Sequence, residues 1–159
     1  MDTSFSKEDR FYQACSHGDS RAVRECLHGK MCINTRRSDG FTGLHIASYC
    51  SHTNIVRILS QNKAEIDLQD GNNETAPTNA CQKGHKHVVK SLLEHTANVD
   101  INDEKGVTAL MIACLNGHNH IVNLLLLHNA QIDKKTIVDE TTALMIACEK
   151  GHNHVIQSL

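Results

Sequence analysis

A set of residues recurs along this chain at intervals of 33 residues, and this repetition constrains the fold more than any other feature. Threonine stands at 42, 75 and 108 and again, one residue late, at 142. Alanine follows each threonine five residues later, and Gly-His pairs begin at 84, 117 and 151, with Ser-His at 51. Units of this size bury their apolar side chains only by stacking on one another, so the pattern predicts a solenoid.

Each unit has the signals of two short helices and a turn. The four threonines are predicted N-caps, because a threonine hydroxyl accepts an otherwise unpaired N–H at a helix start. The glycine of each Gly-His pair is predicted to end the first helix in a left-handed conformation. A second helix then carries Val, Ile and Leu, and a polar stretch with Gly40, Asn73 or Gly106 predicts a hairpin turn before the next unit.

The same register extends toward the N-terminus, where Phe11 takes the position of Leu44 and Ala14 that of Ala47. The chain is therefore predicted to be one domain, residues 1–159, with about four and a half repeats. We assign a divergent N-terminal cap to 1–38, full repeats to 39–71, 72–104 and 105–138, and an incomplete repeat to 139–159.

The repeated residues resemble the motif of the ankyrin-repeat family. The resemblance is carried by Asp39-Gly40-Phe41-Thr42-Gly43-Leu44-His45-Ile46-Ala47 and by Gly106-Val107-Thr108-Ala109-Leu110-Met111-Ile112-Ala113-Cys114-Leu115-Asn116-Gly117-His118, and it covers about residues 7–159. It implies an all-α ankyrin-repeat solenoid of stacked helix–loop–helix units with β-hairpin-like loops. It also implies a non-enzymatic protein without cofactors, which binds protein partners on a concave face.

Three departures from the motif lead to further expectations. Pro77 occupies the position of a core leucine, so the second full repeat is predicted to be the least stable. Glu140 replaces the turn glycine of the last unit, so that hairpin is expected to be distorted. The chain stops at Leu159 inside the final helix, from which we expect a fragment of a longer array.

Composition narrows the classes of function. Sixteen Lys and Arg against 18 Asp and Glu give a net charge of −2, which provides no general drive toward nucleic acid. Apolar runs are too short for a membrane span, and the N-terminus lacks the apolar stretch of a secretory signal. Seven cysteines without a Cys-x-x-Cys pair indicate reduced thiols in the cytoplasm, with the nucleus as the alternative. We expect a monomer.

Histidines and cysteines also follow the repeat. Three His-x-His pairs, His85/His87, His118/His120 and His152/His154, allow a metal-binding hypothesis, but residues two apart on a helix diverge. The first histidine of each pair is instead expected to hydrogen-bond across the stacked repeats, and we predict no metal site. Cysteines 15, 81, 114 and 148 share one column, where they are expected to pack as small buried apolar residues. Cys50 is predicted to be exposed and the thiol most open to oxidation.

No catalytic motif occurs, so the candidate site is a recognition surface. The resemblance places it on the hairpin tips and the ends of the inner helices. In the first full repeat these positions are Arg36, Ser38, Asp39, Phe41, Tyr49 and Cys50, and in the second they are Asn72, Glu74, Gln82 and Lys83. The third contributes Glu104, Lys105, Val107, Leu115 and Asn116, and the fourth contributes Asp139, Thr141, Glu149 and Lys150.

Within this surface, the best candidates for binding energy are Arg36, Phe41 and Tyr49, flanked by Val107 and Leu115, since aromatic and arginine side chains dominate interfaces. The leading hypothesis is a protein-binding scaffold with a preformed surface. One alternative is a targeting module of a larger multidomain protein whose activity lies beyond Leu159. The other is metal binding through the His-x-His pairs.

Overall fold

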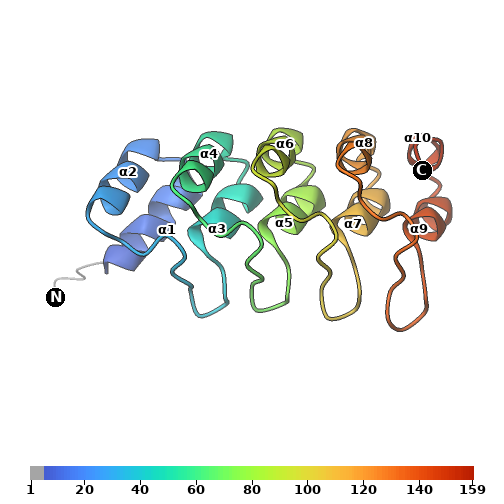
Figure 1. Ribbon diagram of the computed structural model, residues 1–159, viewed down its shortest axis with the longest axis horizontal. Coiled ribbons are helices and arrows are strands. Elements are labelled where there is room, and N and C mark those ends of the chain that lie inside the picture. The colour runs from blue at the N-terminus through green and yellow to red at the C-terminus, as the bar shows by residue number, and fades with distance from the viewer. Residues whose placement is uncertain (1–5) are drawn as a thin grey trace.

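The computed structural model describes residues 6–159; the first five residues of the predicted cap lie outside this range. Five helix pairs follow one another along the described chain (Figure 1). The inner helices are α1 (Lys7–His17), α3 (Gly43–Tyr49), α5 (Ala76–Lys83), α7 (Ala109–Leu115) and α9 (Ala143–Lys150). The outer helices are α2 (Ser20–His28), α4 (Thr53–Gln61), α6 (Lys86–Glu94), α8 (Asn119–Leu127) and α10 (Asn153–Ile156).

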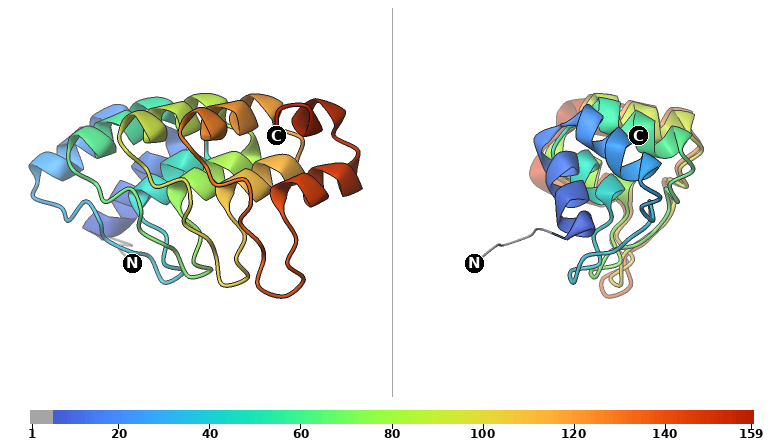
Figure 2. Two further views of the ribbon diagram at one scale, coloured as in Figure 1. Left: turned by 45° about the vertical axis from the view of Figure 1, so that its right-hand side comes forward. Right: turned by 90° about the vertical axis from the view of Figure 1, so that its left-hand side faces the viewer.

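The helices form two layers, with long loops projecting from one side (Figure 1). We call these loops finger 1 (29–42), finger 2 (62–75), finger 3 (95–108) and finger 4 (128–142). Viewed along the array, successive fingers extend in the same direction, below the inner helices (Figure 2). Each inner helix packs on the next inner helix and each outer helix on the next outer helix. The predicted all-α ankyrin-type solenoid is therefore confirmed.

The predicted threonine caps are confirmed at all four positions. The hydroxyl oxygens of Thr42, Thr75, Thr108 and Thr142 each accept the backbone N–H three residues later. At Thr42 the cap is reciprocal, because His45 Nδ1 accepts the backbone N–H of Thr42. These caps start the inner helices in register, one per repeat.

The glycine that ends an inner helix packs against the histidine that starts the outer helix of the next repeat. Gly18 and Gly84 lie in the left-handed region, with φ of 77° and 74°. A Cβ at Gly84 would approach the His118 ring to 2.8 Å, and a Cβ at Gly18 would approach His52 equally closely. Glycine is therefore required twice over, by the turn and by the histidine of the next repeat packing on it.

The core lies between the helix layers and follows the predicted columns. Fully buried positions recur at one place per repeat in the outer helices, as the columns of 55, 88 and 121 and of 59, 92 and 125 show. Phe11, Leu44 and Leu110 share the main inner-helix column and are at most 2% exposed. Pro77 fills the same column in the first turn of α5, where its missing N–H costs nothing.

The fingers are narrow hairpins held by backbone hydrogen bonds. Asp70 N–H donates to the Glu74 carbonyl at 2.8 Å, and corresponding bonds close fingers 1 and 3 across the same number of residues. In finger 4 the bond runs from Thr136 N–H to Thr141 O and spans one residue more. Glu140 is left-handed there, with φ of 52°, so the last hairpin is wider, as expected from the missing glycine.

The α9 end of the array corrects one prediction. Cys148 was expected in a buried column but is exposed, and Leu144, in the inner-helix leucine column, is 43% exposed. Their equivalents in α7, Leu110 and Cys114, are buried because α9 covers them. Within residues 6–159 no helix covers the far side of α9 in the same way.

The prediction that Cys50 is exposed was also wrong. Its side chain is half-buried, with Sγ 4.0 Å from the Ser16 hydroxyl, because α1 stacks against the end of α3. Cys32, in finger 1, is exposed instead.

In the described part of the chain, no helix combines the length and the apolar character that a membrane crossing requires.

Candidate functional site

The fingers are rigidly shaped by aspartate side chains. Asp103 Oδ1 accepts the backbone N–H groups of Lys105 and Val107, both at 2.8 Å. Asp70 Oδ1 accepts the N–H groups of Asn72 and Glu74 in the same way. These bonds hold the finger tips in one conformation without a partner, which limits the entropy lost when a partner binds.

Neighbouring fingers are also bonded to each other. Gly71 N–H donates to the Asp39 carbonyl at 3.0 Å, and Ile137 N–H donates to the Lys105 carbonyl at 2.8 Å. The side-chain amide of Gln69 joins fingers 2 and 3 through Asn102 O. The fingers and the exposed sides of the inner helices therefore form one continuous surface, which we call the finger–helix surface.

All nineteen predicted site residues are accessible. Phe41, Cys50, Glu74, Val107 and Thr141 are half-buried, and the other fourteen are exposed. Tyr49 is 42% exposed and Leu115 44%. These placements leave the predicted interface a prediction, because accessibility alone does not identify a binding site.

The finger–helix surface is hollowed near the first full repeat. A pocket of about 390 Å³ lies between α1, finger 1 and α3, and its lining residues are Ser16, Arg37, Phe41, Ile46, Tyr49 and Cys50. A second hollow of about 570 Å³ shares Ser16 and Arg37 and extends along α1. Together they form a hollow lined by both apolar and polar side chains, a mixture that recognition sites share.

Two aromatic side chains of this pocket are held by neighbours. The Lys83 ammonium lies 4.3 Å from the centre of the Tyr49 ring, a cation–π contact that links α5 to α3. The Phe41 ring lies 5.6 Å from the His45 ring, centre to centre. Both aromatic groups are thus oriented in the free protein.

The structure brings together part of the predicted binding cluster. Phe41 and Tyr49 line one pocket, but the Arg36 guanidinium donates to the Gln69 carbonyl at 2.6 Å and Arg37 lines the pocket instead. Val107 and Leu115 lie two repeats farther along, outside this pocket.

Sequence reasoning missed Ser16, Arg37 and Ile46 as lining residues. A signal existed for two of them. Ser16 precedes Tyr49 by one period of 33, and Ile46 precedes Tyr49 by three residues on the same helix face. Arg37 carried no such signal, because only the path of finger 1 decides which of two adjacent arginines faces the pocket.

Carboxylates concentrate at the middle of the finger–helix surface. Burial, and then the nearby charges of Asp70 and Asp103, raise the pKa of the Glu74 carboxyl. The Oδ2 atom of Asp70 is buried and accepts no hydrogen bond from the described residues. Farther along, Lys105 and Lys150 alternate with Glu104 and Glu149, so the surface as a whole carries mixed charge.

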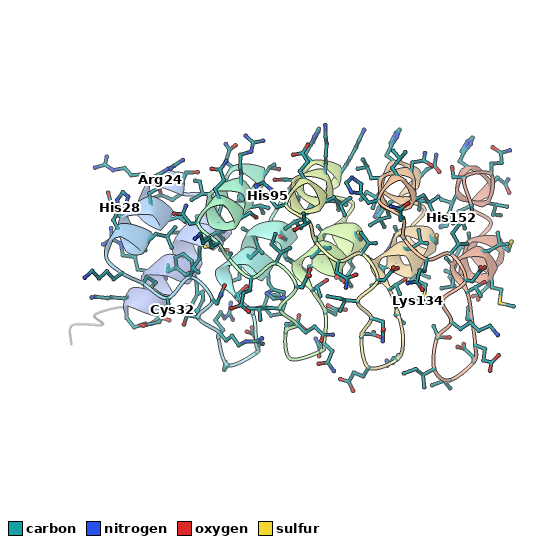
Figure 3. All side chains as sticks on the ribbon, viewed as in Figure 1. Arg24, His28, Cys32, His95, Lys134 and His152 are labelled. Atoms are coloured by element: carbon teal, nitrogen blue, oxygen red, sulfur yellow. The ribbon has the colours of Figure 1, made fainter. Side chains whose placement is uncertain are left out.

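The histidine columns connect repeats. His52 Nε2–H donates to Ser16 O at 2.8 Å, His85 to Tyr49 O at 3.0 Å and His152 to Leu115 O at 3.1 Å. His152, labelled in Figure 3, is the residue immediately before the last outer helix, α10. Within residues 6–159, no three His, Cys, Asp or Glu side chains gather to hold a metal ion. The predicted inter-repeat bonds are therefore present at His85 and His152, and His52 makes an equivalent one. The His118 ring packs on Gly84 but makes no such bond to the described residues, so the prediction was wrong there.

Five stacked helix pairs with projecting fingers and a hollowed finger–helix surface define a helical repeat solenoid. The family model for ankyrin repeats, in three copies, matches residues 6–70 and 61–136. The chain therefore belongs to the ankyrin-repeat family, whose repeats generally serve as protein–protein interaction modules and typically lack enzymatic activity. No curated protein matches this chain.

Proposed function

We propose that this chain is a non-enzymatic scaffold that binds a partner protein or peptide on its finger–helix surface. The observation that carries the proposal is the pocket around Phe41 and Tyr49. Its aromatic groups are accessible, already oriented, and set in a groove with apolar and polar lining. Exposed aromatic side chains in such a groove are the type of residue that supplies most of the binding energy at interfaces.

The partner has an apolar side chain that enters this pocket and a polar flank that meets Arg37. Rigid fingers support this assignment, since a surface that is ordered before binding loses little entropy on association. Mixed charge along the fingers indicates a partner of mixed polarity. We further propose residence in the cytoplasm or nucleus, because all seven cysteines are free thiols.

The test is affinity capture followed by mass spectrometry, with the wild type and the double variant Phe41→Ala/Tyr49→Ala. Leu127→Ala serves as the matched control, because Leu127 is an apolar residue of the outer layer that is 78% exposed. All three proteins are first compared by circular dichroism. We expect a partner that the control retains and the double variant loses.

Retention of every partner by the double variant would move the interface away from this pocket. The alternative, a targeting module within a larger protein, keeps the same binding surface and differs in what is attached to it. Metal binding makes a different prediction: zinc would bind with measurable heat in calorimetry, and capture would depend on zinc and be lost with chelator.

A further inference from the structure

The outer helices of the first three repeats are net basic, whereas fingers 2 to 4 are net acidic. The outer helices α2, α4 and α6 carry five basic residues and two acidic ones; the basic residues are Arg21, Arg24, Arg57, Lys86 and Lys90. Fingers 2 to 4 carry ten carboxylates against four lysines. Figure 3 shows nitrogen-tipped side chains, Arg24 among them, directed away from the array on the outer-helix side.

Three of the basic residues occupy the same position in successive repeats. Arg24, Arg57 and Lys90 are separated by 33 residues each, and all three are exposed. Their helices are direct neighbours, since α2 packs on α4 and α4 packs on α6. Packed helices lie about 10 Å apart, so the three charges form a row with that spacing. We call this row the basic ridge.

The positive charges of the basic ridge are largely unpaired by carboxylates. Glu25 forms salt bridges with Arg10 at 2.8 Å and with Arg21 at 3.0 Å, and not with Arg24. Lys90 has only a loose contact of 3.8 Å with Glu94. Within residues 6–159 no carboxylate lies in salt-bridge range of Arg24 or Arg57. The ridge ends after α6, because Asn123 and Gln157 take the corresponding places in the next two repeats.

We propose that the basic ridge of Arg24, Arg57 and Lys90 binds an acidic, extended polypeptide segment. In the extended polyproline II conformation a chain advances about 3.1 Å per residue with three residues per turn, so carboxylates three residues apart lie on one face about 9 Å apart, close to the spacing of the ridge. The recognised sequence is therefore an Asp or Glu at every third position over three repeats. This site is separate from the pocket at Phe41 and Tyr49, which lies on the other side of the inner helices.

Two features favour a polypeptide over other polyanions. The ridge helices carry no exposed large apolar residue that would enter a lipid surface, and no aromatic residue on which nucleic-acid bases would stack. Three charges in a row are also few for nucleic acid, where binding proteins commonly neutralise six to ten phosphates, as an order of magnitude. A short acidic segment needs only the three contacts that the ridge offers.

The test uses two labelled peptides of equal charge, Glu-Gly-Gly-Glu-Gly-Gly-Glu and Glu-Glu-Glu-Gly-Gly-Gly-Gly, titrated at low salt and followed by fluorescence anisotropy. The spaced peptide should bind more tightly than the contiguous one. Arg57→Gln should weaken its binding about fivefold, the upper range for one exposed charge contact. Lys135→Gln removes the same charge from finger 4, outside the candidate site residues, and should leave binding unchanged.

Amide chemical shifts of the isotope-labelled protein locate the contact during the same titration. Shifts along α2, α4 and α6 support the proposal. Equal affinity for both peptides, equal effects of Arg57→Gln and Lys135→Gln, shifts confined to the fingers, or no shift at all would overturn it. Tighter binding to phosphatidylserine vesicles or to single-stranded RNA than to the spaced peptide would overturn it as well.

Discussion

The Nε2–H of His85 donates to the main-chain carbonyl of Tyr49 over 3.0 Å, which joins the start of α6 to the end of α3 in the preceding repeat. This hydrogen bond is adjacent to the candidate site, because the side chain of the same Tyr49 lines the pocket. A residue that holds repeats together therefore also fixes the backbone of a proposed binding residue. Stability and recognition share this part of the structure.

This contact predicts different roles for the two histidines of one His-x-His pair. His85→Ala should lower the free energy of unfolding by about 1–2 kcal/mol, because it removes a hydrogen bond and its packing between repeats. His87→Ala, at an exposed position of α6, should change it by less than about 0.5 kcal/mol. Urea titrations followed by far-UV circular dichroism measure both. Equal losses for the two variants would contradict the prediction, because the inter-repeat hydrogen bond of His85 would then add nothing to stability.

Stability should fall as the pH drops from 7.5 to 5.5, and His45 should account for part of the loss. Burial lowers the pKa of His45, whose Nδ1 accepts the Thr42 N–H and whose Nε2–H donates to Glu74 O at 3.2 Å. The unfolded chain binds this proton more readily, so stability present above about pH 6.5 is lost below it.

His45→Gln isolates that contribution. Urea midpoints at the two pH values should differ less in the variant than in the wild type. The raised pKa of Glu74 acts in the opposite sense, since its carboxyl binds a proton more readily when the protein is folded. A wild-type midpoint that stays constant between pH 7.5 and 5.5 would contradict this prediction.

The seven thiols should react in an order set by burial. Burial raises the pKa of Cys15 and of Cys114 to about 12, with smaller contributions at Cys15 from Cys26 and Cys50, and it also raises the pKa of Cys81. These three thiols are protonated and covered, whereas Cys32 and Cys148 are exposed. Brief alkylation of the folded protein should label Cys32 and Cys148 first, as peptide mass spectrometry would report. Labelling of Cys81 at the same rate would be incompatible with the buried column.

Equivalent leucines in α7 and α9 should contribute differently to stability. Leu110 is 1% exposed and Leu144 is 43% exposed, although both occupy the same repeat position. Leu110→Ala should cost about 3 kcal/mol of unfolding free energy, while Leu144→Ala should cost less than about 1 kcal/mol. Chemical denaturation measures both, and a larger loss for Leu144 would show that the end of the array is covered in solution.

Substituting leucine for Pro77 should stabilise the protein. Pro77 stands in the column of Leu44 and Leu110, which are fully buried, and a leucine there would bury additional apolar surface. Pro77→Leu should raise the free energy of unfolding by about 1 kcal/mol. Hydrogen exchange provides the second readout, because α5 and α6 should become better protected. A lower stability would mean that α5 has closed around the proline and leaves no room for leucine.

Much of this fold was readable from the sequence. Each repeat needs a threonine that caps an inner helix, a glycine or a tolerant substitute at its left-handed end, and apolar columns that stack. Thr108 and Gly84 shape their own helix ends, and Leu92 packs in a column that repeats from unit to unit. A spacing of 33 residues in the sequence is therefore enough to predict their roles. The hydrogen bonds of His85 and His152 followed from the same regularity.

Irregular positions were decided by tertiary contacts. Cys148 follows the sequence column of Cys114 but is exposed, because burial in a stack depends on what covers the helix and not on the residue. Cys50 was expected to be open and is half-buried beside Ser16. Among the adjacent arginines, Arg36 bonds to finger 2 and Arg37 lines the pocket.

The sequence by itself determined the solenoid and its register, because repeated local signals specify repeated local structure. Only the tertiary structure decided which side chains of different repeats meet on the surface. It joined Ser16 and Tyr49 in one pocket and aligned Arg24 with Arg57 and Lys90 on adjacent helices. Such neighbours are brought together by stacking geometry, which places residues 33 apart side by side and leaves residues one apart on different faces.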